Sequence, residues 1–265
     1  MTPPRYRAAR VGGCLAAHVE RRADGGVLLG STEPLQPYPP RLTDRLEQWA
    51  RKAPQRTFVA RRDRGGDWIR IPYAQMLERA RAVGQALATR PLSAERPVAI
   101  LSDNDLEHLT LYLGAMWVGV PVVPVSPAYW LVSQDFGKLR HVLATTTPGL
   151  VFASDARYAK AIAATVGAGV EVVLAHGALE DRPTTPFASL LAAVPGAEVD
   201  ATHATVGPET IVKFLFTSGS TKQPKAVVNT QRMPCANQQM IRQSFAFLAD
   251  EPPVHRACRT PPSPA

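Results

Sequence analysis

A short run of small hydroxyl residues closed by a lysine is the part of this sequence best suited to chemistry. It follows an apolar β-type run, Thr210–Phe216. The residues that could contact a ligand are Thr217, Ser218, Gly219, Ser220, Thr221 and Lys225. Such a turn can point several backbone N–H groups and four hydroxyls into one concavity, and the glycine leaves room for close approach. With an ammonium group at its end, the run at 217–225 is predicted to bind phosphate oxygens.

Two other interpretations of this run were compared. It is not a Walker A loop, because Gly219 and Lys225 enclose five residues and no glycine directly precedes the lysine. A plain Ser/Thr-rich hairpin turn would also account for the composition. Spacing alone leaves the phosphate cradle and the plain turn both open.

The run from Phe216 to Lys225 resembles the phosphate-binding signature of the adenylate-forming (AMP-binding) superfamily. That superfamily includes acyl- and aryl-CoA synthetases, luciferases and the adenylation domains of peptide synthetases. Two positions depart from the signature. Lys222 stands where most members have glycine, and Ala226 stands where glycine is usual.

A narrower resemblance is to the feruloyl-CoA synthases, and it covers roughly residues 5–254. The segments that carry it are Ser31–Pro34, Pro39–Arg45, Val132–Arg140, Lys213–Phe216, Val228–Met233 and Asn237–Met240. The resemblance implies an acid–CoA ligase whose small-molecule substrates are a hydroxycinnamic acid, ATP and coenzyme A, with Mg²⁺ as the companion of ATP. The carboxylate would attack the α-phosphorus of ATP to give an acyl-adenylate, and the CoA thiolate would then displace AMP.

By this resemblance the turn at 217–225 would hold the ATP phosphates. Such a reaction depends on positioning and charge neutralisation more than on covalent help from the protein. Two alternatives remain open: a non-catalytic fragment that binds nucleotide or phosphate, and a remnant that does not fold because its partial sheet leaves an open edge.

Members of the family are considerably longer, and their later motifs are not found after Asp250. The sequence from His255 onward is rich in proline and arginine. We expect an N-terminal fragment without a complete catalytic set, inactive by itself, with a disordered and possibly frameshifted tail at 251–265. The expected organisation is an extension at 1–40, a partial adenylation domain at 41–250, and that tail.

The elements that must position the turn alternate along the chain. Short apolar runs rich in valine alternate with helical patterns, which predicts an incomplete α/β domain with a doubly wound, mostly parallel sheet. The predicted strands are Pro97–Leu101, Val122–Val125, Leu150–Ala153, Val170–Ala175, Thr210–Phe216 and Ala226–Asn229. The predicted helices include Tyr73–Ala88, Leu106–Val118, Ser133–Ala144, Arg157–Val166 and Met233–Phe247.

The flanking segments are less regular. A helix begins at Leu42 with Thr43 as its expected cap, and Thr57–Ala60 with Trp68–Ile71 predicts a hairpin. Residues 177–209 are predicted to be a loose connector with one short helix at Phe187–Ala193.

Composition limits the class without choosing a function. The 265 residues carry a formal net charge of +8, but aromatic residues do not interleave with the arginines as a nucleic-acid platform requires. Three widely spaced cysteines without metal-ligand spacing indicate a reducing cytoplasm. No apolar run is long enough for a membrane span. The oligomeric state is not predicted.

Other chemistry-bearing residues have simpler interpretations. Asp103, Asp105 and Glu107 lie near a helix start, where acidic groups usually serve as caps. The predicted roles of Trp117, Tyr129 and Trp130 are in packing. The remaining candidates are histidines that are expected to pack or to lie on the surface, without partners at metal spacing: His108, His141, His176 and His203.

Overall fold

Valine-rich runs in the middle of the chain form one seven-stranded sheet in the computed structural model, which describes residues 16–63, 65–131, 135–217 and 223–245. The strand order is β11-β10-β6-β5-β7-β8-β9. The strands are β5 (Val98–Leu101), β6 (Val122–Pro124), β7 (Leu150–Ala153), β8 (Glu171–Leu174), β9 (Thr185–Pro186), β10 (Ile211–Thr217) and β11 (Lys225–Thr230). Every neighbouring pair is parallel except β10 and β11. The predicted mostly parallel α/β sheet is confirmed.

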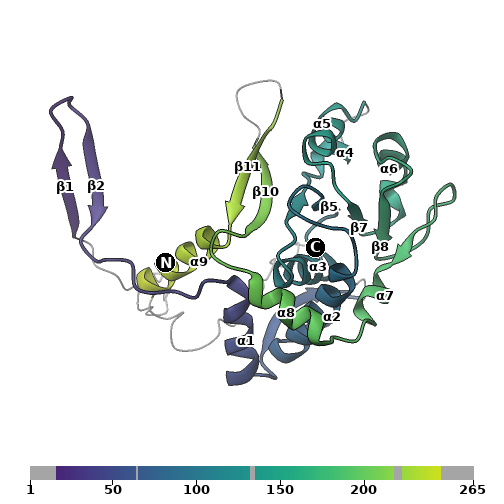
Figure 1. Ribbon diagram of the computed structural model, residues 1–265, viewed down its shortest axis with the longest axis horizontal. Helices are drawn as coiled ribbons and strands as arrows, with labels where there is room; N and C mark the ends of the chain where they lie inside the picture. Colours follow the sequence, from purple (N-terminus) through teal and green to yellow (C-terminus); the bar gives the residue numbers. More distant parts are fainter. Residues whose placement is uncertain (1–15, 64, 132–134, 218–222, 246–265) are drawn as a thin grey trace, which may run out of the picture.

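Helices cover both faces of this sheet (Figure 1). On one face lie α2 (Tyr73–Ala88), α3 (Leu106–Trp117), α7 (Phe187–Leu191) and α8 (Ala197–Thr205). On the other lie α4 (Ala128–Leu131), α5 (Gly137–Thr146), the short 3₁₀ turn Ala156–Tyr158 and α6 (Ala159–Thr165). The doubly wound arrangement follows because successive crossovers use both faces.

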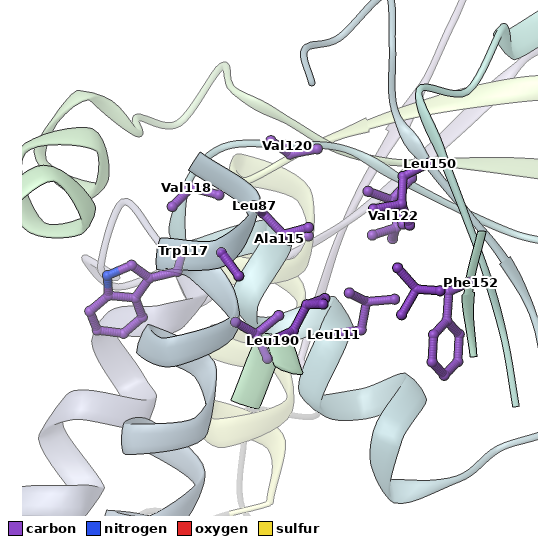
Figure 2. Close-up of a cluster of buried hydrophobic side chains, with 14 of the residues drawn as sticks. Leu87, Leu111, Ala115, Trp117, Val118, Val120, Val122, Leu150, Phe152 and Leu190 are labelled. Carbon is purple, nitrogen blue, oxygen red and sulfur yellow. The ribbon is translucent and has the colours of Figure 1, made fainter. Parts of the chain in front are cut away.

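The central strand β5 shows why these runs are apolar throughout. Val98 and Ile100 join the cluster under α2 and α3, whereas Ala99 and Leu101 join the cluster under α5 and α6. All four are fully buried, because side chains alternate between two covered faces. Figure 2 shows the first cluster, in which Leu111 lies between Trp117 at one side and Phe152 at the other.

A third cluster joins α1 (Leu42–Lys52) to α2 and α3. Leu46 and Ala50 of α1 pack with Met76 of α2 and Met116 of α3, and Val212 of β10 completes the contact. This cluster connects the start of the chain's main body to the hairpin that carries the phosphate-binding candidate.

The start of α1 corrects one expectation. Thr43 is not its cap, because it lies inside the helix, fully buried, with its hydroxyl 2.9 Å from Nε2 of His203. The helix begins after Arg41, whose backbone N–H donates to the Asp44 carboxylate at 3.2 Å. The Thr43 hydroxyl therefore makes a buried contact with His203 instead of capping the helix.

Two antiparallel hairpins lie outside the main sheet. Of these, β3 (Thr57–Arg62) and β4 (Trp68–Pro72) form the predicted hairpin. The other, β1 (Ala17–Arg21) with β2 (Val27–Ser31), falls in the segment expected to be an extension; all ten of its residues are exposed, and it stands apart from the rest (Figure 1). The connector at 177–209 contains β9 and α8 in addition to the predicted helix.

Helix α9 (Arg232–Ser244) follows β11 and completes the described chain. Its first turn is tied to the hairpin, because the Gln231 N–H donates to the Thr210 carbonyl at 2.9 Å. The expected tail at 251–265 lies outside the described residues. Among the residues that are described, no helix combines the length and apolarity that a bilayer crossing demands.

Candidate phosphate-binding site

The candidate turn begins and ends on a strand pair that the rest of the sheet holds in place. Thr217 is the last residue of β10 and Lys225 is the first residue of β11, and the two lie opposite each other in the antiparallel register. Directly opposed residues project from the same face of a hairpin, with Cβ atoms about 5 Å apart. The hydroxyl of Thr217 and the ammonium group of Lys225 therefore share one face at the mouth of the turn.

The middle of the turn lies outside the described residues. This holds for the four other predicted ligand residues, Ser218, Gly219, Ser220 and Thr221, and also for Lys222. What the structure supplies is the frame, in which seven residues connect the ends of two paired strands. The role of Thr217 and Lys225 as phosphate ligands stays a prediction.

Both described ends of the turn are open to solvent. Thr217 and Lys225 are exposed. Within the described part of the chain, the Lys225 side chain has no hydrogen-bond or ion-pair partner. An ammonium group without a carboxylate neighbour can accept an anionic ligand without first losing an ion pair. The described end of this strand pair can therefore receive an anion.

His141 of α5 fixes the base of the turn. Its Nε2 lies 2.9 Å from the Pro224 carbonyl oxygen, and because a carbonyl can only accept, the imidazole donates this bond. Its ring also meets Phe216 edge to face, at 6.3 Å between centroids. Pro224, which directly precedes Lys225, is buried by these surroundings. Sequence analysis assigned no ligand role to His141, because its partner is a backbone carbonyl 83 positions away.

The two faces of the β10–β11 hairpin have different surroundings. Phe214 and Phe216 pack against the cluster under α5 and α6, so Thr217, Leu215 and Lys213 project to the opposite face. On that face Lys213 approaches the ring of Tyr112, at 6.0 Å. One face thus anchors the strands, and the other presents two cationic side chains, Lys213 and Lys225.

The remaining candidates have structural roles. Asp105 caps α3, accepting from the His108 N–H at 2.6 Å, and burial raises the pKa of its carboxyl. His108 lies 2.9 Å from the Ser102 hydroxyl through Nδ1. Trp117 and Trp130 are buried in the two face clusters. In the described ranges, no three carboxylate, imidazole or thiol groups gather closely enough to hold a metal ion.

Known proteins resemble this chain in sequence and in fold. The sequence profile described as AMP-binding enzyme matches residues 46–257. A propanoyl:CoA ligase of Rhodococcus jostii, whose acyl chain carries a methyl-dioxo-octahydro-indenyl group, is 27% identical over 195 residues, 71% of this chain and 37% of its own length. The 4-coumarate–CoA ligase-like 9 of Arabidopsis thaliana is 28% identical over 164 residues, 61% of this chain and 27% of its own.

Solved structures share the fold. The fatty acid AMP ligase of Legionella pneumophila superposes with a TM-score of 0.59 at 20% identity, over 78% of this chain and 33% of that one. The sheet and its helices match the N-terminal portion of the large domain of such enzymes. The chain thus spans between about a quarter and two fifths of the length of the relatives compared here.

Proposed function

The chain belongs to the AMP-binding enzyme family, and from this premise we propose that it is the N-terminal portion of an ATP-dependent acid–CoA ligase whose turn at 217–225 holds the ATP phosphates. The single observation that carries the proposal is the exposed pair of Thr217 and Lys225 at the end of an anchored strand pair. An aromatic acid of the hydroxycinnamate class is the proposed substrate, on the resemblance to feruloyl-CoA synthases. The relatives that are CoA ligases support the reaction class.

The described residues fit only part of the reaction's requirements. A hydroxyl and an ammonium group at the turn suit polyphosphate oxygens, because charge-assisted contacts to phosphate are strong. The described residues provide no cluster of carboxylates for Mg²⁺. We therefore propose that this chain binds and orients the ATP phosphates.

The first test measures ATP binding. We expect Lys225→Ala to weaken ATP binding by about tenfold or more, the scale of one lost charge-assisted contact. Lys160→Ala is the matched control, since Lys160 is an exposed lysine on α6. Fluorescence titration with a nucleotide analogue measures both variants. Equal affinity of Lys225→Ala and the unaltered chain would contradict the proposal.

A second test separates ligase chemistry from binding alone. We expect the chain to bind ATP but to form no acyl-CoA when ferulate, ATP and coenzyme A are supplied. We expect this result because the chain covers only 37% and 27% of the length of two relatives that are CoA ligases. Pyrophosphate release that depends on ferulate, or detectable thioester, would show that the described portion is catalytic by itself.

The origin of the C-terminal text has its own test. We propose that residues 251–265 belong to a shifted reading frame, as the change to proline- and arginine-rich sequence indicates. Sequencing the gene around codon 254 and beyond should show ligase-like sequence in another frame. An in-frame stop with no such sequence in any frame would refute the frameshift.

A further inference from the structure

A groove of about 520 Å³ lies between α1, α3 and α9, away from the phosphate turn. Its lining residues come from these three helices, from β3 and from the first residue of α2. They include Arg45, Phe58, Tyr73, Tyr112, Ile241 and Arg242. Most are aromatic or aliphatic, and at this size the groove can enclose a small organic molecule.

The two arginines of the groove have no acidic hydrogen-bond partner among the described residues. Arg45 donates to two neutral amides, Gln48 at 3.2 Å and Gln239 at 3.3 Å. Arg242 makes no hydrogen bond or ion pair with any residue that the structure describes. None of the described lining residues carries a carboxylate. The two guanidinium groups therefore repel each other across one wall of the groove. The carboxylate that acts on Arg45 is that of Asp44, which lies outside the lining and is already paired with Arg41 at 2.8 Å.

The electrostatics of Arg45 reflect this arrangement. Burial lowers its pKa first, and the nearby positive charge of Arg242 lowers the pKa further. Like charges that are partly removed from water raise the free energy of a site. An anion placed between the two arginines would relieve both costs.

The walls of the groove are apolar enough to hold a hydrophobic body. Phe58 and Tyr73 stack edge to face at 5.0 Å, and Tyr112 stands beside them. Burial raises the pKa of Tyr112 to about 12, which indicates a low-dielectric wall. Ile241 is 39% exposed and would be covered by a ligand.

The groove is already formed, which lowers the cost of binding. The Leu42 N–H donates to the Gln231 side chain at 3.1 Å and holds the start of α9 against α1. Near the other end of α9, the Gln36 N–H donates to the Gln243 side chain at 2.9 Å. Because α9 is fixed at both ends, little ordering is needed on binding.

We propose that this groove binds an organic carboxylate with an apolar body, whose carboxylate lies between Arg45 and Arg242 while the body lies on the aromatic wall. Guanidinium groups match the two oxygens of a carboxylate, and the apolar wall requires an apolar chain. The site is distinct from the phosphate turn. The turn and α9 lie at opposite ends of the β10–β11 hairpin, about 20 Å apart for a seven-residue strand.

The test compares two ligands of equal length, decanoate and 1-decanol, by titration calorimetry on the full chain without ATP. We expect saturable one-to-one binding of decanoate, and binding of the alcohol at least about tenfold weaker because it has no charge for the arginines. Equal binding of the two ligands would identify an unspecific apolar surface. Absence of saturable decanoate binding to folded protein would also overturn the proposal.

Variants locate the ligand. Arg242→Gln, on the exposed side of α9, should weaken decanoate binding by about tenfold and leave decanol binding unchanged. Arg51→Gln is the matched control, since Arg51 lies on α1 outside the groove. Equal affinities of these two variants would place the carboxylate elsewhere. Lys225→Ala should retain decanoate binding, so that failure of the groove and failure of the phosphate turn can be told apart.

Discussion

His203 shows how one side chain can serve two neighbouring elements. Its ring stacks on Trp117 at 4.0 Å between centroids, and its Nε2 lies 2.9 Å from the Thr43 hydroxyl. The side chain is 7% exposed. Burial is the main cause that lowers its pKa, to about 4, and the positive charge of Arg41 adds to it. The neutral imidazole therefore belongs to the folded state.

This depressed pKa makes stability depend on pH. Between about 6.5 and 4 the unfolded chain binds more protons at this histidine than the folded chain does, so stability falls as the pH falls. From pH 7 to pH 5 we expect His203 to account for a loss of about 2 kcal/mol in the free energy of unfolding. Urea denaturation at the two pH values measures this loss.

His203→Gln should flatten the pH dependence by that amount, although its stability at pH 7 will also be lower because the ring stacking is lost. His18→Gln, on the exposed β1 strand, is the control and should leave the slope unchanged. A slope that is the same in His203→Gln as in the unaltered chain would contradict the assignment.

His141 is a second histidine whose removal should have a measurable effect, because it contacts the residue before Lys225. Removing its bond to the Pro224 carbonyl in His141→Ala should increase amide exchange across residues 216–230 by roughly three- to tenfold, the value of one hydrogen bond. Hydrogen–deuterium exchange with mass spectrometry measures it. His176→Ala is the comparison, because 63% of the His176 side chain is exposed. Unchanged protection around Lys225 would show that the turn does not depend on α5.

Sequence analysis can select residues whose chemical type suggests a role, although the role of Thr217 and Lys225 as phosphate ligands stays a prediction. Thr217 and Lys225 were selected by hydroxyl and ammonium groups at a fixed spacing, and the structure places them opposite each other. His141 could not be selected in this way, because its contacts are created by tertiary packing between α5 and the hairpin. A side chain that binds a distant backbone carbonyl leaves no pattern in the local sequence.

At the scale of elements, α2 and α3 pack closely because glycine lies at their contact. An added Cβ at Gly114 would lie 2.6 Å from Cγ1 of Val83. We expect Gly114→Ala to lower the free energy of unfolding by about 1–2 kcal/mol, because overpacking outweighs the helix propensity that alanine adds. Chemical denaturation measures the change.

The control for this substitution is Gly207→Ala, where an added Cβ meets nothing within 4 Å and which should change stability by less than about 0.5 kcal/mol. A Gly114→Ala variant as stable as the unaltered chain would show that the two helices can separate without cost.

The elements that sequence analysis missed share one cause. Helix α8 buries Val199 and His203, four positions apart, and a histidine at the second position does not signal an apolar face. The β1–β2 hairpin buries no residue, so it has no core-facing pattern to detect. Helix α2 was predicted with its observed bounds because its apolar residues recur at helical spacing.

At the scale of the whole molecule, one edge of the seven-stranded sheet is formed by β11, whose side chains are partly exposed. Val227 and Val228 of β11 are 44% and 45% exposed, although neighbours on a strand point to opposite faces. Met233, Met240 and Ile241 of α9 are exposed as well. The edge strand therefore offers unpaired backbone groups beside apolar side chains, which favours association with another chain.

We expect the chain to self-associate at micromolar concentrations through this edge. Val227→Lys should shift the sedimentation profile toward the monomer, since a charged edge strand resists pairing. Val19→Lys on the separate β1–β2 hairpin is the control, and should leave the profile unchanged. Association that persists equally in Val227→Lys would place the contact elsewhere.

The sheet class was predictable for the whole molecule because strands covered on both faces must be apolar throughout. The exposed edge was not, because the apolar residues 226–228 of β11 resemble those of a buried strand and only the strand order places β11 at the end of the sheet. Sequence indicates which segments are strands, but their neighbours decide which faces are covered.

The position of β10 in the strand order also bears on the sequence of events in folding. Strands β5 to β8 join through crossovers between residues 98 and 174, whereas Lys213 of β10 must find Val122 of β6, ninety-one positions earlier. Closing so long a loop is slow compared with local pairing. We therefore expect the hairpin that bears Thr217 and Lys225 to join the sheet last, after the strands that support it have paired.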